Sequence, residues 1–210
     1  MTQLTRAHNE LFRRSPDERF ESLQALWDHC HRECEQSQDR WHPPQAIRPV
    51  PEEGRFRIDL GGEGTFNLND WSFSQLCRLA NVNKDTLNRV SPGTAARIFE
   101  ETLPSGDKPL QAYTLDEQVR SIHGAGYTRL YNVDLLTTLR EFTTDFQPPQ
   151  PGMNGGTGLY CGEQDMFCFL IDPAGWTEIG GEAFAPGFFL WNSEVGKRSV
   201  GIQTFWFPAD

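Results

Sequence analysis

The sequence lacks any apolar run that approaches the roughly 20 residues of a membrane-spanning helix. Its first residues, MTQLTRAHNELFRRS, also lack the apolar stretch of a secretory signal. We therefore expect a cytoplasmic protein with no membrane association. Cysteine is scarce, with five residues spread from Cys30 to Cys168. An odd number at such wide spacing argues against a disulfide framework and fits reduced thiols.

Positive charge is also in short supply. The chain has 19 Lys and Arg against 29 Asp and Glu, which gives a net charge of −10. This balance disfavours non-specific binding to a phosphate backbone, which needs a basic surface. The net charge does not exclude a local basic patch.

No strong catalytic motif is present. Cys161 and Cys168 fall in predicted strands, where cysteine is usually a small core residue, and the nearest candidate base in the sequence is His123. The glycine-rich stretch Asn154–Gly158 lacks the lysine of a phosphate-binding loop. We therefore expect no enzymatic activity and no cofactor, and we keep an uncharacterised enzyme as the third hypothesis.

A cluster of candidate zinc ligands lies at His29–Cys34, where His, Cys and Glu alternate over six residues, and His42 follows. A structural zinc site needs four convergent ligands, usually as two pairs on separate elements. Because no second pair is evident, the sequence predicts no metal site.

The N-terminal half predicts helices and one short strand. A helix is expected from a cap at Ser15 to about Ser37, and a second helix opens at Ser91-Pro92. The proline-rich stretch Trp41–Gly54 reads as a linker or wrapping arm. Phe56–Leu60 alternates in polarity and predicts a strand that ends at Gly61-Gly62.

The C-terminal half predicts hairpins. Val119–Ile122 and Tyr127–Tyr131 flank Gly124-Ala125-Gly126 as one hairpin, and Asn132 caps a helix after it. Gln147–Gly158 is rich in Pro and Gly and is the expected flexible loop. Four strands follow, the last two paired: Leu159–Gly162, Met166–Ile171, Phe188–Asn192 and Ser199–Phe207.

Helices followed by hairpins indicate a single α+β domain. It should contain an antiparallel meander of β-hairpins, a helical hairpin and an N-terminal helical arm. We divide the chain into an N-terminal helix and Pro-rich arm at residues 1–54 and an α+β domain at residues 55–210.

The segment Phe73–Val90 predicts two short amphipathic helices around a tight turn. Asn81-Val82-Asn83 forms the turn, with Asn83 as N-cap. The string ANVNKDTLNRV, which ends at Val90, resembles the turn and recognition helix of the lactose-repressor-type regulators, with Asn81 in place of the usual glycine. The alternative is a helical hairpin that only packs on a sheet.

Aromatic residues are dense near the C-terminus: Phe188, Phe189, Trp191, Phe205, Trp206 and Phe207. Alternate members of a strand face opposite sides. One side could stack bases of single-stranded nucleic acid, or both sides could pack on the protein itself or on a partner. The final strand also predicts an exposed sheet edge or a strand paired with a partner.

The C-terminal two-thirds resembles a known family. The stretches are YTRLYNVDLLTTL at Tyr127–Leu139, LYCGEQDMFCFLID at Leu159–Asp172 and GFFLWNSEVGKRSVGIQTFWF at Gly187–Phe207. They resemble the phage/plasmid-like family called domain of unknown function 932, and the most specific strings are Asp165–Phe167 and Asn192–Gly196. The resemblance implies an origin in phages, plasmids or other mobile elements, and it carries no catalytic residues.

We expect a non-enzymatic accessory protein of a mobile element that binds DNA in recombination or replication, favouring single strands and acting as an oligomer. The alternative is an acidic protein-interaction module or inhibitor, such as a DNA mimic or a defence-evasion protein. The candidate DNA-binding residues are Lys84, Asn88, Arg89, Arg97, Trp191, Lys197 and Arg198.

Overall fold

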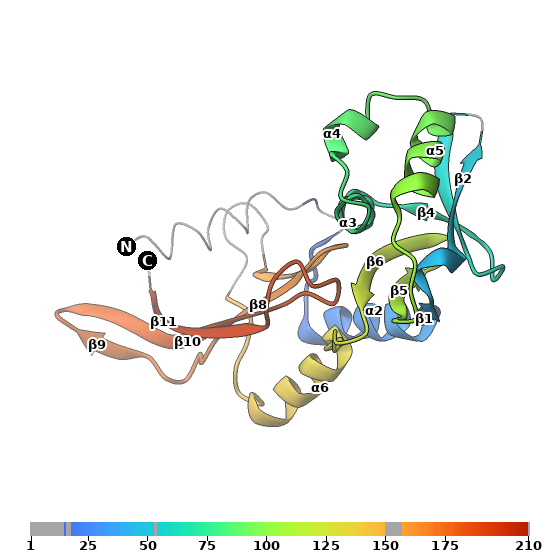
Figure 1. Ribbon diagram of the computed structural model, residues 1–210. Helices are drawn as coiled ribbons and strands as arrows, with labels where there is room; N and C mark the ends of the chain where they lie inside the picture. The colour runs from blue at the N-terminus through green and yellow to red at the C-terminus, as the bar shows by residue number, and fades with distance from the viewer. Residues whose placement is uncertain (1–14, 16–17, 53, 150–156, 210) are drawn as a thin grey trace. The chain divides into compact units, whose positions relative to one another are not determined.

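The computed structural model describes residues 15, 18–52, 54–149 and 157–209. The chain forms two compact units (Figure 1). Unit 1 combines Met1–Cys34 with Leu130–Asp210, and unit 2 is the intervening segment Glu35–Arg129. The predicted α+β fold is confirmed, with two mostly antiparallel sheets and helices packed on them.

Unit 2 is built on a six-stranded sheet in the order β1-β5-β6-β4-β3-β2. All neighbours are antiparallel except β4 and β6, which run parallel. The strands are β1 (Ser37–His42), β2 (Ile47–Glu52), β3 (Arg55–Leu60), β4 (Thr65–Leu68), β5 (Leu110–Leu115) and β6 (Gln118–Gly124). The strand expected at Phe56–Leu60 is β3, and Gly61 follows it at a positive φ of 61°.

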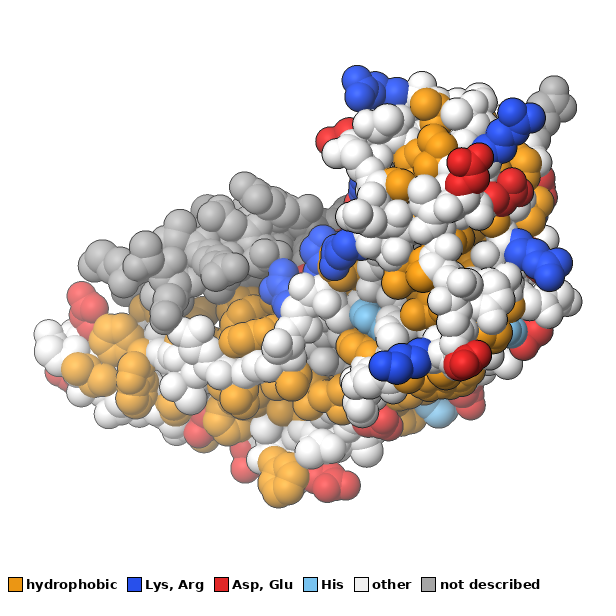
Figure 2. All heavy atoms as spheres, in the orientation of Figure 1, with side chains coloured by type: hydrophobic (Ala, Val, Ile, Leu, Met, Phe, Trp, Pro, Cys, Tyr) orange, Lys and Arg blue, Asp and Glu red, His pale blue; other side chains and the backbone are white. Residues whose placement is uncertain are grey.

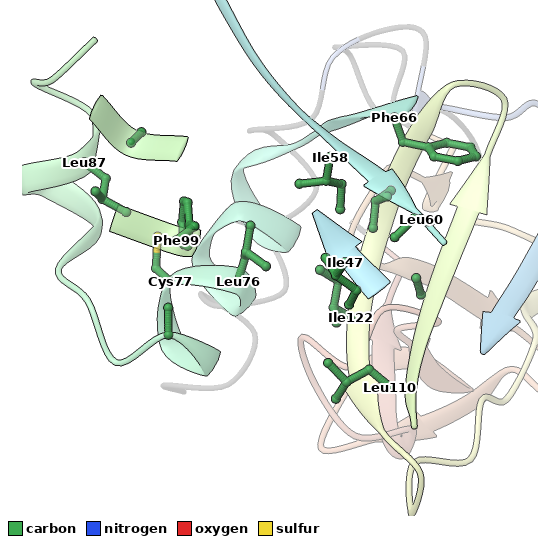
Figure 3. Close-up of a cluster of buried hydrophobic side chains, with 14 residues drawn as sticks. Ile47, Ile58, Leu60, Phe66, Leu76, Cys77, Leu87, Phe99, Leu110 and Ile122 are labelled. Atoms are coloured by element: carbon green, nitrogen blue, oxygen red, sulfur yellow. The ribbon is translucent and has the colours of Figure 1, made fainter. Parts of the chain in front are cut away.

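Helices α3 (Asp70–Leu79) and α5 (Pro92–Thr102) pack on this sheet, and the short helix α4 (Lys84–Leu87) packs against α3. Asn69 caps α3. Ser91 caps α5 through the Thr94 amide, where the sequence predicts a helix start. Figure 3 shows the core between helices and strands, where Leu76 and Cys77 of α3 join Phe99 of α5.

The expected arm at Trp41–Gly54 is wrong, because this stretch forms sheet structure. It holds the end of β1, a 3-10 turn at Pro44–Ala46 (η2) and all of β2, which pairs with β3. Prolines lack the N–H that a central strand must donate, so they are tolerated here because β2 lies at the sheet edge. Gly54, the predicted domain boundary, lies in the turn between β2 and β3.

The hairpin expected around Gly124-Ala125-Gly126 is also misplaced. β6 pairs with the preceding strand β5 across a turn at Asp116-Glu117, and Tyr127–Tyr131 forms no strand. Asp116 takes a positive φ of 51°, which Asp tolerates in tight turns. The hairpin turn therefore forms at Asp116-Glu117 and not at the glycines of Gly124-Ala125-Gly126, which the sequence pattern favoured.

Unit 1 is built on a second, fully antiparallel sheet in the order β11-β10-β8-β7, with β9 beside β10. Its strands are β7 (Leu159–Cys161), β8 (Met166–Ile171), β9 (Thr177–Ile179), β10 (Glu182–Asn192) and β11 (Gly201–Pro208). The predicted pairing of the last two strands is confirmed. The flexible loop expected at Gln147–Gly158 lies largely outside the described residues.

Two helices cover one face of this sheet, α2 (Leu23–Gln36) and α6 (Asn132–Phe142). Leu26 and Leu136 pack fully buried on strand residues such as Leu170. The Trp27 indole N–H donates to Thr137 Oγ1 at 2.9 Å and so ties the two helices together.

The first of these helices starts later than the sequence predicts. Ser15 does not cap it, because α2 begins at Leu23 and the chain before it pairs with β7: Arg19 bridges Tyr160, and the Phe20 amide donates to the Leu159 carbonyl at 3.0 Å. The helix begins after Ser22, whose hydroxyl accepts from the Ala25 amide at 3.1 Å. None of the described helices is both long and apolar enough to cross a bilayer.

Candidate functional site

The two strings on which the expected family resemblance rests meet in unit 1, at the start of β8 and the end of β10. Asn192 Nδ2 donates to Asn132 Oδ1 at 2.9 Å and to the Leu130 carbonyl at 2.8 Å. The Ser193 hydroxyl donates to the Gln164 carbonyl at 2.6 Å. These buried bonds join the turn after β10 to the turn before β8 and to the start of α6.

Glu194 holds the first turn of α6. Its Oε1 accepts from the Asn132 amide at 2.6 Å, and the residue is only 8% exposed. The prediction that Asn132 caps this helix is wrong, because Tyr131 occupies the cap position and makes no side-chain cap bond. A carboxylate at a helix N-terminus meets both the unpaired amides and the positive end of the helix dipole.

Asp165 and Arg198 form a pair next to this cluster. Arg198 Nη2 lies 3.0 Å from Asp165 Oδ2, and the guanidinium carbon lies 4.7 Å from the centre of the Phe167 ring. The Asp165 side chain is 4% exposed and that of Arg198 is 33% exposed. The guanidinium therefore compensates a buried carboxylate while part of it still faces solvent.

Cys161, at the end of β7, lies against α2, whereas His123 belongs to unit 2. Its Sγ lies within 4.8 Å of the candidate ligand atoms of His29 and Glu33. The Cys30 contact and burial raise the pKa of Cys161 well above its ordinary value. A reactive nucleophilic thiol needs a lowered pKa and access to solvent, so this buried thiol does not have the properties of a catalytic nucleophile.

An aromatic face covers the side of the unit 1 sheet opposite α2 and α6. It consists of Tyr160, Phe167, Phe169, Phe189, Trp191 and Phe205. Phe189 lies at its centre and stacks on Phe169, with ring centres 4.4 Å apart, and on Phe167 at 5.2 Å. Its ring centre is also 5.1 Å from that of Trp191.

Two glycines let rings lie flat on this face. A Cβ at Gly201 would come within 2.1 Å of the Trp191 ring, and a Cβ at Gly187 within 2.7 Å of the Phe205 ring. Phe189, Trp191 and Phe205 remain partly exposed. Figure 2 also shows hydrophobic side chains gathered over β9, β10 and β11, where Ile202 and Trp206 are more than half exposed.

The helical pair in unit 2 matches the predicted turn. Asn81 takes a positive φ of 54°, which explains why glycine is usual at such a position, and Asn83 Oδ1 accepts from the Thr86 amide at 2.9 Å. The second helix, α4, has only four residues. Lys84 pairs with Asp70 and also donates to its carbonyl at 3.3 Å.

The predicted DNA-binding residues divide between the two units. Lys84, Asn88, Arg89 and Arg97 lie on α4, α5 and the turn between them in unit 2. Trp191, Lys197 and Arg198 lie in unit 1, where Arg198 connects to Trp191 through Phe167 and Phe189.

Sequence reasoning named His29 and Asn132 but missed their partners, and it missed the role of Glu194. Glu194 and Asn192 lie 62 and 60 residues from Asn132 along the chain, and Cys161 lies 132 residues from His29. Only the unusual polarity of Asn192-Ser193-Glu194 at the end of an aromatic strand signals a buried role. Comparison with protein-family models, curated proteins and solved structures finds no match.

Proposed function

We propose that this protein binds single-stranded DNA as a non-enzymatic accessory protein of a mobile element. The observation that carries the proposal is the aromatic face, where partly exposed rings of Phe189, Trp191 and Phe205 lie on one side of an antiparallel sheet. Bases of any sequence stack on such rings, and each base stacked contributes about 1–3 kcal/mol. The mobile-element setting rests on the family resemblance alone.

Two cations adjoin this face. Lys197 is exposed, and Arg198 lies over Phe167 with a third of its side chain open. The chain as a whole carries −10, so few phosphates would be neutralised. With about two phosphate contacts, the logarithm of the affinity should fall with the logarithm of salt by a slope of only about −1.4. Stacking, rather than charge, would supply most of the affinity.

The oligomer in this proposal uses the edge strand β11. It lies at the end of the sheet order, beside β10, and exposes Ile202 and Trp206. An edge strand offers unpaired backbone groups to another strand. A second copy of the chain could continue the sheet there and extend the aromatic face.

The test is binding of the purified chain to labelled single- and double-stranded oligonucleotides across a salt series, with the mass measured by light scattering. Trp191→Leu should weaken single-strand binding about 5- to 150-fold, the equivalent of one lost stacking contact. Trp41→Leu is the matched control, since Trp41 is an exposed tryptophan on β1 of unit 2 and belongs neither to the aromatic face nor to β11. Equal losses in the two variants would refute the aromatic face as the binding surface.

Double substitutions separate the two predicted DNA-binding elements. Lys197→Ala with Arg198→Ala should reduce the salt slope, whereas Lys84→Ala with Arg89→Ala should leave single-strand binding unchanged. The reverse pattern would move the site to the helical pair of unit 2. Absence of binding to either form of DNA at low salt would refute the proposal and favour the acidic protein-interaction module.

A further inference from the structure

Nitrogen, oxygen and sulfur ligand atoms converge in unit 1 where α2 packs against the end of β7. The candidate ligand atoms of His29, Glu33 and Cys161 all lie within 4.8 Å of one another. His29 Nε2 is 3.7 Å from Glu33 Oε2.

Helix geometry accounts for the first part of this cluster. His29 and Glu33 are four residues apart and so lie on the same side of α2. Their side chains are 29% and 23% exposed, which leaves a route from solvent. The Phe20 ring packs on the imidazole of His29 at 4.9 Å and restricts its orientation.

The cluster also has outer support of the kind that metal thiolates use. Asn132 Nδ2 points at Cys161 Sγ from 3.6 Å. Its amide is oriented from the other side, because Asn132 Oδ1 accepts from Asn192 Nδ2 at 2.9 Å. Donors that contact a ligand and are themselves held by further bonds are typical of the shell around protein metal sites.

We propose that His29, Glu33 and Cys161 bind one zinc ion, with a water molecule as the fourth ligand. The set has one imidazole nitrogen, one carboxylate oxygen and one sulfur, which matches the N, O and S preference of Zn²⁺ for sites with three protein ligands. On binding, the Cys161 thiol loses its proton to solvent and forms a Zn–S bond, while neutral imidazole, the carboxylate and the water complete the shell.

The distances require only a local contraction. Zinc bonds of about 2.0–2.3 Å at tetrahedral angles place ligand atoms about 3.3–3.8 Å apart. The His29–Glu33 separation already lies in that range, and the remaining separations of the three-residue set are at most 4.8 Å. The bound ion would cross-link α2 to β7, two segments about 130 residues apart in the sequence, and so act structurally.

Cobalt(II) is the probe for this site, since thiolate ligation gives a charge-transfer absorption that carboxylate or imidazole sites lack. The full chain, purified under reducing conditions and stripped of metal, should bind one Co²⁺ with this band, and Zn²⁺ should displace it. His29→Ala and Cys161→Ser should each weaken Co²⁺ binding by more than about 100-fold, beyond the range typical for outer-shell changes.

Matched controls lie on the same helix. His31→Ala, which removes a ring stacked on Trp27, and Cys34→Ser should retain the band and the affinity. Circular dichroism would show that His29→Ala, at a partly exposed position, remains folded. A band that is absent, or that persists in His29→Ala and Cys161→Ser, would overturn the proposal. A Cys30–Cys161 disulfide found by mass spectrometry of freshly purified protein would overturn it as well.

Discussion

Replacement of Glu194 should show how much the α6 cap contributes to the stability of unit 1. Glutamine keeps an oxygen acceptor but removes the charge, whereas alanine leaves the buried Asn132 amide without its 2.6 Å acceptor. Hydrogen bonds to charged groups contribute about 1.5–3 kcal/mol and neutral ones about 0.5–1.5 kcal/mol. We therefore expect a loss of about 1 kcal/mol for Glu194→Gln.

The alanine variant should lose more, because an unsatisfied buried amide costs about 1–3 kcal/mol and the dipole interaction is lost as well. We expect about 2–3 kcal/mol in total, equivalent to a fall in Tm of about 5–10 °C for a chain of this size. Urea unfolding followed by circular dichroism measures both losses. Because Glu194 is 8% exposed, the losses should change little with salt.

Glu178→Ala is the control, since Glu178 is an exposed acid on β9 of the same unit and should change stability by less than about 0.5 kcal/mol. Two results would refute the reasoning about the cap. One is a Glu194→Ala variant as stable as this control. The other is a glutamine variant that loses as much as alanine, which would make charge rather than the hydrogen bond the whole effect.

Three further predictions concern residues in both units. Asp39→Ala should lower the free energy of unfolding by about 3 kcal/mol in urea, because it removes the carboxylate partner of the Arg129 guanidinium, whose side chain is 2% exposed. A loss below about 1 kcal/mol would contradict this. Burial raises the pKa of Cys77 to about 11 in the folded protein. The unfolded chain therefore loses the Cys77 proton at a lower pH than the folded protein does. Stability should fall as pH rises from 9 to 11, by at most about 2 kcal/mol, and Cys77→Ala should lack this part of the decline; an identical slope in the variant would refute it. Gly201→Ala should push the Trp191 ring off the sheet, since the new Cβ would lie 2.1 Å from it; unchanged tryptophan fluorescence would contradict the geometry.

Local sequence patterns predicted the elements whose causes are local. Asn83 and Ser91 cap helices where expected, and the alternating Phe56–Leu60 forms a strand. The prediction missed elements that depend on distant partners. Pro49 and Pro51 are typical of loops, but they lie in β2, an edge strand whose only neighbour in the sheet is β3.

The candidate sites divide in the same way. The aromatic density at Phe188–Phe207 predicted a possible stacking surface, because strand alternation alone separates its two sides. The zinc cluster could not be predicted, since the ligand that completes His29 and Glu33 is Cys161, far along the chain. Only the packing of α2 on β7 brings that sulfur into reach.

The Asp39–Arg129 pair has a consequence for the order of folding. These residues lie near the two ends of unit 2, and Arg129 Nη2 reaches Asp39 Oδ1 at 2.8 Å. Bringing the ends of roughly 95 flexible residues together costs about 4 kcal/mol of chain entropy. If unit 2 folds first, this ion pair has already brought the two ends of unit 2 together. The segments Met1–Cys34 and Leu130–Asp210 are then connected as if by a short linker. The two segments of unit 1 should therefore associate at a rate close to that of segments adjacent in the sequence.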